Sequence, residues 1–234
     1  MSAKRRIAPP RRSSSELTDL VLQSCLVAKD AAFNLRDFIE NSSSMAFIAV
    51  KDCEKELDRM ERRVDQEITS AITQVGKSEA RELLACVKFS IDLERIGDLA
   101  WSITQRLQVL PSRLMRDDAA ELTAMAETLE KMLETIHRGF VTRDLESAKW
   151  VLQTDSQMDL ACRSIFRRHL ESQDRRPRDY ASSLLLIAQA FERAGDHAKN
   201  LGEELFHLVE GRSMRHEPKE RRRSGGRFST VEDI

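Results

Sequence analysis

The chain contains one motif twice, and this repetition constrains its fold more than any other feature. Residues 93–106 and 191–204 share the pattern E-R-x-G-D-x-A, with Glu94 and Glu192 separated by 98 positions. A motif of this length that recurs at a long interval indicates a duplicated structural unit. We therefore predict two similar halves, each built around one copy of the motif.

Each copy is predicted to be an amphipathic helix that presents two acids on one side. At about 100° per residue, the apolar side chains around each copy share one face, and the acids lie away from it. In the first copy this apolar stripe includes Phe89, Leu93 and Ile96. The pairs Glu94/Asp98 and Glu192/Asp196 each have a four-residue spacing. Acids so placed repel by roughly 0.2–0.5 kcal/mol, so their repetition indicates that a cation lies between them. The alternative is a solvated acidic face neutralised by nearby arginines such as Arg95.

Composition favours helices over sheets. Charged residues make up 33% of the chain and aromatic residues 5%, with 8 Gly and 5 Pro among 234 residues. These values are typical of long amphipathic helices. The length is sufficient for one large domain or two of about 100 residues, and the repeat favours two. We predict an all-α fold of two tandem antiparallel three-helix bundles related by internal pseudo-symmetry.

Apolar periodicity and helix-breaking residues predict three helices in each half. Ser15 is the expected cap of the first helix, Gly76 and Ser78 the turn and cap before the third, and Pro111 its end. The predicted helices span about 15–40, 45–75, 78–110, 117–142, 144–171 and 179–210. The predicted domains are a first bundle at 14–110 and a second at 111–211.

Both ends of the chain are expected to be disordered and basic. Residues 1–13 and 212–234 are rich in Arg and poor in apolar side chains. The net charge of −1 gives no global field that would recruit nucleic acid or membrane. The chain has no apolar run long enough to cross a membrane and no signal-peptide pattern, and its four cysteines are scattered singly. We therefore predict a cytoplasmic protein.

The second helix of each half carries further acids that would face the motif acids. Glu54 and Asp58 are spaced by four residues, as are Asp155 and Asp159. Carboxylates without cysteine make a hard oxygen site, which suits Mg, Mn, Ca or Fe better than tetrahedral Zn. Residues that could extend the two sites are Glu61 and Asp65 in the first, and Asn200 and Glu203 in the second. The alternative is charge patterning on a solvated bundle.

Other chemistry has weaker support. A ferritin-like di-iron centre would use Glu134 with His137 and Glu204 with His207, but both glutamates lie away from their apolar stripes. No G-x-S-x-G elbow and no phosphate-binding glycine loop occurs, so we predict that the protein is not an enzyme. His197 is interpreted as a histidine at the edge of the core.

The duplicated motif resembles that of the PhoU family of phosphate-transport regulators. The similarity spans about residues 16–210, with its most specific parts at 91–98, 191–200 and along the fifth helix. In that family, paired E/D-x-x-x-D motifs can bind multinuclear metal clusters. The resemblance implies metal ligands at Glu54, Asp58, Glu94, Asp98, Asp155, Asp159, Glu192 and Asp196. It implies Fe, Mn, Mg or Zn as the metal and no organic cofactor.

The resemblance also implies a function. Such proteins act as negative regulators that link the ATPase of a phosphate ABC transporter to a sensor histidine kinase when phosphate is plentiful. They are commonly homodimers and lie at the membrane through their partners, so no nucleic acid is expected. Ser102 and Gln105 stand where the second copy has Asn200 and Glu203, which makes the second bundle the better candidate for metal. The alternative function is a helical docking or nucleic-acid-associated protein without a metal role.

Overall fold

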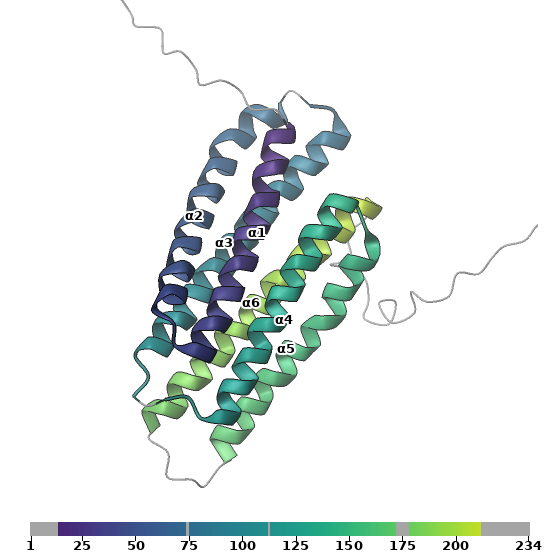
Figure 1. The fold of residues 1–234 in the computed structure, drawn as a ribbon. Helices are drawn as coiled ribbons and strands as arrows, with labels where there is room; N and C mark the ends of the chain where they lie inside the picture. Colours follow the sequence, from purple (N-terminus) through teal and green to yellow (C-terminus); the bar gives the residue numbers. More distant parts are fainter. Residues whose placement is uncertain (1–13, 74, 112, 172–177, 212–234) are drawn as a thin grey trace, which may run out of the picture.

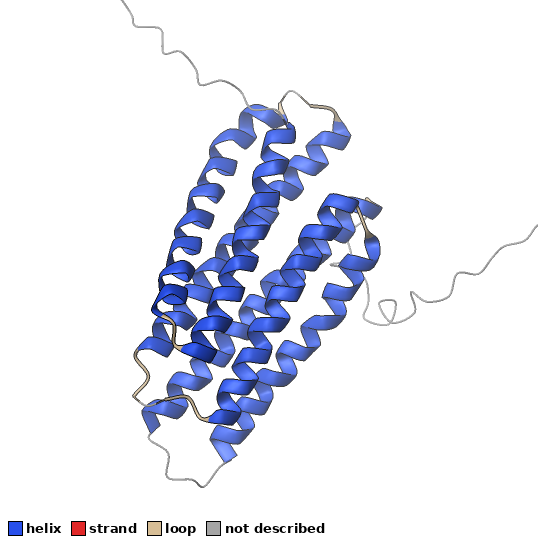
Figure 2. Ribbon diagram, in the orientation of Figure 1, coloured by secondary structure: helices blue, strands red, loops and turns tan. Residues whose placement is uncertain are grey.

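A computed structural model describes residues 14–73, 75–111, 113–171 and 178–211 of the chain. Every regular element within these ranges is an α-helix, and none is a strand (Figure 2). The six helices are α1 (Ser14–Asn41), α2 (Ser44–Ile72), α3 (Lys77–Gln108), α4 (Arg116–Thr142), α5 (Leu145–Glu171) and α6 (Arg178–Glu210). The ends predicted to be disordered, and most of the turn before α6, lie outside the described residues.

The helices form two antiparallel bundles that lie side by side (Figure 1). Helices α1, α2 and α3 pack together, and so do α4, α5 and α6. The bundles join where α1 packs against α4 and α3 packs against α6. The predicted all-α fold of two tandem three-helix bundles is confirmed.

One hydrophobic core runs through both bundles. The predicted apolar stripes are buried, and Phe89 of α3 meets Phe140 of α4 edge to face, with ring centroids 4.9 Å apart. Aromatic pairs of this geometry stabilise a fold beyond the area that they bury. Because the core is continuous across the bundles, the proposed division of the chain at residues 110 and 111 stays a prediction.

The helix ends differ in detail from the sequence-based expectation. The Ser43 hydroxyl caps α2 by accepting a hydrogen bond from the Ala46 amide at 3.2 Å. Ser15 and Ser78 were expected to be caps, but both lie inside helices; Gly76 precedes α3, and its amide donates to the Glu79 carboxylate. Helix α3 ends at Gln108, before Pro111 is reached. These shifts are small because periodicity fixes a helix more firmly than its terminal residues.

The turn between α4 and α5 is built by two polar residues. Arg143 adopts the left-handed conformation at φ 55° and ends α4. Asp144, expected to be the first residue of the next helix, instead caps it, because its carboxylate accepts from the Glu146 and Ser147 amides and the Ser147 hydroxyl. The hydroxyl bond first, and the amides with it, lower the pKa of Asp144. This fixes where α5 starts.

Polar contacts lie at the interface between the bundles, where α3 packs against α6; we call this interface the seam. Lys88 of α3 pairs with Glu204 of α6 at 2.8 Å, and Asp92 accepts from His197 and Asn200. Glu204 was predicted to lie away from the core, yet it is 5% exposed. The helical projection considered one bundle at a time, and the far side of α6 is covered by α3 of the other bundle. None of the helices in the described ranges has both the length and the hydropathy that crossing a membrane requires.

Candidate functional site

The motif glycines let two helices approach closely at the predicted sites. A Cβ atom on Gly97 would lie 2.6 Å from Leu57 Cδ1 of α2 and 3.7 Å from the Glu54 Cα. A Cβ on Gly195 would lie 3.1 Å from Met158 Cγ of α5. An alanine at position 97 would force Leu57 to move, whereas an alanine at position 195 would require only a small shift of Met158. The glycine of E-R-x-G-D therefore brings α3 onto α2, and α6 onto α5, beside the acids.

The first acid cluster, as we name it, combines two acids from α2 with two from α3: Glu54, Asp58, Glu94 and Asp98. Burial first, and then the charges of Asp98 and Asp58, raise the pKa of Glu54. Burial and then the charge of Asp98 also raise the pKa of Glu94. Acids on the two helices thus influence one another across the close contact.

Arginines neutralise part of the first acid cluster. Arg95 lies 3.4 Å from Glu94 and 3.2 Å from Asp98, and Arg62 lies 2.6 Å from Asp58. Each arginine belongs to the same helix as its partner, and the Arg95 side chain is 55% exposed. Exposed pairs of this kind contribute about 0–1 kcal/mol each. Lys51 and Lys55 also lower the pKa of Glu54 through their charges, although burial and the neighbouring acids outweigh them.

The second acid cluster consists of Asp155 and Asp159 of α5 with Glu192 and Asp196 of α6. Loss of hydration and then the Asp155 charge raise the pKa of Asp196. Lys199 of α6 reaches across to α5 and pairs with Asp155 Oδ2 at 2.5 Å. Burial lowers the pKa of Lys199, but the hydrogen bond and charge of Asp155 outweigh it, so the pKa is raised. This cluster already contains a cation supplied by the chain.

Two further features of the second acid cluster were not predicted. Asp155 is 5% exposed, and its Oδ1 atom is buried without a hydrogen-bond partner. The Cys162 thiol donates to Glu192 Oε2 at 3.3 Å, and burial together with this carboxylate raises the pKa of Cys162 to about 12. A buried carboxylate oxygen without a donor is costly unless a ligand or cation serves it.

Of the four residues that the sequence offered as further ligands, some lie near the acid clusters and others do not. Glu61 lies close enough to Glu94 for its charge to raise the pKa of that group, whereas Asp65 is exposed. Asn200 donates to Asp92 at 3.3 Å, in the seam between the bundles, and not to the second acid cluster. Glu203 is half-buried. The sequence could not separate the two sides of α6 because both carry polar residues.

The donor chemistry suits a hard metal ion, but the side chains are not gathered around a point. In the described part of the chain, no group of three or more His, Cys, Asp or Glu side chains is placed to hold a metal ion. Basic side chains occupy several of the carboxylates, most deeply Lys199 at Asp155. The observation that fits a cation is the bare Asp155 Oδ1 atom, and it belongs to the second acid cluster.

The di-iron alternative is not supported by the placement of its residues. Glu134 is exposed on α4, and the partly buried His137 has a pKa lowered by burial and by Lys29. Glu204 is held by Lys88 at 2.8 Å, with His207 at 3.5 Å. The two Glu-x-x-His turns thus lie on different surfaces and share no interior site.

A buried polar network at one end of the second bundle was missed by the sequence reading. Asp118 is 1% exposed and accepts from Tyr180 at 2.8 Å, with His169 at 2.9 Å and Arg168 at 3.3 Å. Arg168 also pairs with Glu121. These contacts connect α4, α5 and α6 at the end of the bundle where α4 and α6 begin and α5 ends. A signal was available, since Asp118 follows Asp117 at a position where the helical period predicts a buried residue.

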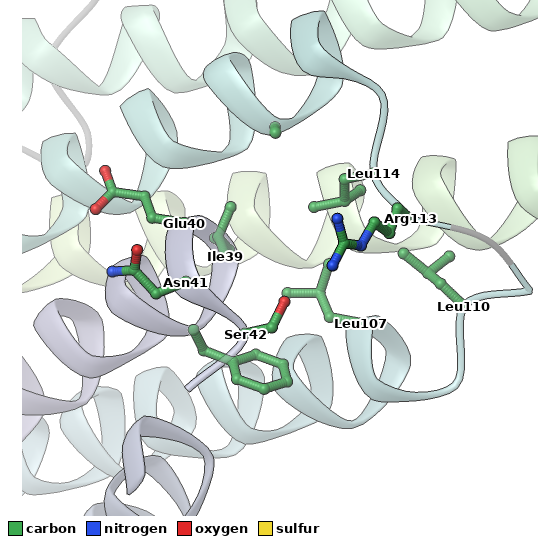
Figure 3. A pocket seen from close by; sticks show the side chains of 10 residues that line it. Ile39, Glu40, Asn41, Ser42, Leu107, Leu110, Arg113 and Leu114 are labelled. Carbon is green, nitrogen blue, oxygen red and sulfur yellow. The ribbon is translucent and has the colours of Figure 1, made fainter. Parts of the chain in front are cut away.

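A cavity of about 450 Å³ lies at the end of the first bundle, away from both acid clusters (Figure 3). Its walls come from the turn after α1, the end of α3 and the linker to α4. Figure 3 shows Arg113 and Leu114 on the linker side and Glu40 and Asn41 on the opposite side. The walls are partly apolar and partly polar, and none of the predicted metal ligands belongs to them.

Curated relatives support the resemblance seen in the sequence. The chain is 28% identical over 191 residues to a protein of Rhizobium meliloti named phosphate-specific transport system accessory protein PhoU homolog, covering 80% of each chain. It is 28% identical over 212 residues to the protein of the same name from Pseudomonas aeruginosa, covering 87% of each. The similarity therefore extends over at least four fifths of both relatives.

Solved structures share the fold. The structure of PhoU from Pseudomonas aeruginosa matches with a TM-score of 0.76 at 23% identity, covering 85% of this chain and 97% of that one. The phosphate transport system regulatory protein PhoU from Streptococcus pneumoniae matches with a TM-score of 0.77 at 18% identity, covering 86% and 96%. At these identities the matches establish the arrangement of helices.

The duplication is also recognised by a family profile. The profile described as PhoU domain matches the chain twice, at residues 25–107 and 122–205. These two segments hold the two acid clusters and the two motif glycines, and together they cover more than half of the chain. The chain therefore belongs to the PhoU family.

Proposed function

We propose that this protein is an accessory regulator of a phosphate-specific transport system and that it damps phosphate uptake and phosphate-starvation signalling when phosphate is plentiful. The observation that carries the proposal is the family match over both halves of the chain. The relatives named above, which it covers over most of their length, are accessory proteins of such transport systems. The regulator acts by binding, not by catalysis.

The partners we propose are the ATPase of the transporter and a sensor histidine kinase, with the regulator itself a homodimer on the cytoplasmic side of the membrane. Long helices with exposed apolar side chains support docking of this kind. Met45 and Ile48 on α2 are 74% and 51% exposed, and Leu160 on α5 is 61% exposed. Such residues cost little when they are scattered singly and gain free energy when a partner covers them.

We propose that the acid clusters bind divalent or ferric ions and so adjust these surfaces. A bound ion would supply positive charge between two helices whose acids otherwise repel. Glu54, Asp58, Glu94 and Asp98 would hold it in the first bundle, and Asp155, Asp159, Glu192 and Asp196 in the second. Burial first, and then the charges of neighbouring carboxylates, raise the pKa values of Glu54, Glu94 and Asp196. A bound cation would relieve the second of these effects, which supports the proposal.

The regulatory proposal is tested by deleting the gene and measuring phosphate uptake and phosphatase expression in excess phosphate. We expect both to rise in the deletion strain and to return to wild-type levels when the full chain is supplied from a plasmid. In a matched control the plasmid supplies the Lys131→Met variant, since Lys131 pairs with Glu127 on the exposed face of α4. Unchanged uptake and unchanged phosphatase in the deletion strain would refute the proposal.

A further inference from the structure

We propose that Lys199 is an internal counter-ion that competes with metal for the second acid cluster, so that the first acid cluster binds metal more readily. The inference rests on the proposed metal binding of the clusters and reverses the order expected from sequence. Sequence favoured the second bundle because Asn200 and Glu203 could add ligands there. The structure places Asn200 on Asp92 and an ammonium group on Asp155 instead.

Lys199 bridges the two helices that hold the second acid cluster. Its Nζ atom crosses from α6 to α5 and pairs with Asp155 Oδ2, so it bridges the two helices that any metal in this cluster would bridge. Its charge is felt also by Asp196 and Asp159. One lysine thus interacts with three of the four acids. At the corresponding position of the first copy stands Trp101, an uncharged side chain that packs on Phe47 with ring centroids 5.0 Å apart. The Lys51 Nζ atom of α2 lies over the Trp101 ring, 5.9 Å from its centroid, so the nearby cation comes from α2 and not from the helix that carries the motif.

The ion pair of Lys199 with Asp155 is more deeply buried than the ion pairs of Arg95 in the first acid cluster. The Asp155 side chain is 7% exposed and that of Lys199 is 32% exposed, whereas Arg95 in the first acid cluster is 55% exposed. Removing one partner of a buried pair leaves an uncompensated charge, while exposed pairs are weak and easily broken. Displacing Arg95 from the first acid cluster therefore costs a metal ion little free energy. Displacing Lys199 costs more, because the Asp155 carboxylate that it would leave is largely buried.

Lys199 leaves one oxygen of the Asp155 carboxylate without a partner. Asp155 Oδ2 is held by Lys199, and Oδ1 is buried with no donor. An ammonium satisfies one oxygen of this carboxylate, whereas a metal ion could engage both. The second acid cluster is therefore not a permanent ion pair that fills its site completely. It is a cation site in which the resident ion leaves one ligand atom free.

The test is a calorimetric titration of the full chain with Mn²⁺, comparing wild type with Lys199→Met. Methionine keeps an unbranched apolar stem and removes the charge. We expect a second class of Mn²⁺ site in Lys199→Met that binds at least tenfold more tightly than any second site in wild type. Adding Asp155→Asn to Lys199→Met should abolish that gain, which assigns it to the second acid cluster. Lys199→Arg keeps the cation and should behave as wild type.

Two controls separate competition from a general charge effect. Arg95→Met should raise Mn²⁺ affinity at the first acid cluster less than threefold, and Lys131→Met should leave binding unchanged. Thermal unfolding with and without Mn²⁺ gives an independent reading, because a ligand that binds only the folded state raises its melting temperature. Mn²⁺ should raise the melting temperature of Lys199→Met more than that of wild type, even if this variant is less stable without metal.

Equal Mn²⁺ affinity in wild type and Lys199→Met would overturn the inference, as would the absence of binding in every variant. Either result would leave the deletion-strain phenotype untouched, so failure of the inference is distinguishable from failure of the regulatory proposal. Tight Mn²⁺ binding by wild type that is lost in Asp155→Asn would likewise contradict competition by Lys199.

Discussion

The two bundles carry the same acids on the same helices and neutralise them in different ways. The first acid cluster meets arginines from its own helices, at exposed positions. The second acid cluster meets a lysine that crosses between helices onto a buried carboxylate. Duplication thus preserved the carboxylate pairs and the glycine that brings the helices together, whereas the counter-charge changed. A repeated motif predicts the common geometry of two sites but not the ions that occupy them.

The ends of the two bundles are also closed by different kinds of contact. One end of the first bundle is closed by an apolar group of Leu17, Ala71 and Leu83. The second bundle is closed where α4 begins by Asp118 and its partners Tyr180 and His169. Apolar packing tolerates small changes of shape, while a buried carboxylate requires all its donors. The second bundle is therefore the more sensitive of the two to loss of a single polar group.

The largest effect should follow from Asp118→Asn. Removing the charge leaves Arg168 with Glu121 as its remaining acidic partner and weakens the contacts to His169 and Tyr180. Breaking a buried pair of this kind costs about 3–5 kcal/mol. Urea unfolding should show a free energy of unfolding lower by about 3 kcal/mol. Asp117→Asn, on the exposed neighbouring residue, is the matched control and should change stability by less than about 0.5 kcal/mol. Equal effects of the two substitutions would contradict the network.

Asp155→Asn should destabilise the metal-free protein by about 1–2 kcal/mol. The substitution separates Lys199 from its partner, and the cost is reduced because the lysine can turn toward Asp159, Asp196 or solvent. Unfolding in the presence of a chelator measures it, with Asp159→Asn as the comparison at the half-exposed rim. A stabilising Asp155→Asn would mean that Lys199 is not the counter-ion of this carboxylate.

The two motif glycines should respond differently to alanine. Replacing helical glycine by alanine gains about 1 kcal/mol, but a Cβ at 2.6 Å from the buried Leu57 forces repacking that costs about 1–3 kcal/mol. Gly97→Ala should therefore lower stability by about 1 kcal/mol. Gly195→Ala faces the flexible Met158 at 3.1 Å and should be neutral or slightly stabilising. Thermal unfolding of the two variants side by side checks the difference, and the reverse order would contradict the packing.

The smallest effect is expected for Glu94→Gln, and its sign depends on pH. Burial and the Asp98 charge raise the pKa of Glu94 above its ordinary 4.5, so the folded state favours the protonated form. The stability that this contributes is present below the ordinary pKa and is lost as the pH rises through the raised pKa. Glutamine mimics the protonated form, so the variant should be more stable than wild type at pH 7 by up to about 0.5 kcal/mol.

The advantage of Glu94→Gln should disappear as the pH falls toward 4, where wild type is itself protonated. Urea unfolding at several pH values in the presence of a chelator measures this. Glu127→Gln is the control, because the Lys131 hydrogen bond lowers the pKa of Glu127 and its removal should not stabilise at pH 7. A Glu94→Gln variant less stable than wild type at pH 7 would show that Arg95 compensates the cluster fully.

Much of the fold could be predicted from sequence because periodicity and duplication are properties of single helices and of their repetition. The stripe of Phe89, Leu93 and Ile96 is buried where the helical projection placed it. The seam residues Lys88 and Glu204 could not be predicted, because their burial depends on how two bundles pack. Lys199 was visible in the sequence, but only the crossing of α6 over α5 makes it a partner of Asp155. Contacts between elements are what a one-dimensional pattern leaves open.

The most direct test of the two-cluster account is the anomalous diffraction of crystals soaked in Mn²⁺, measured for wild type and Lys199→Met. We predict a peak among Glu54, Asp58, Glu94 and Asp98 in both proteins, and a second peak among Asp155, Asp159, Glu192 and Asp196 only in Lys199→Met. A peak beside Asp155 in wild type with Lys199 still paired, or no peak at either cluster in Lys199→Met, would contradict the account.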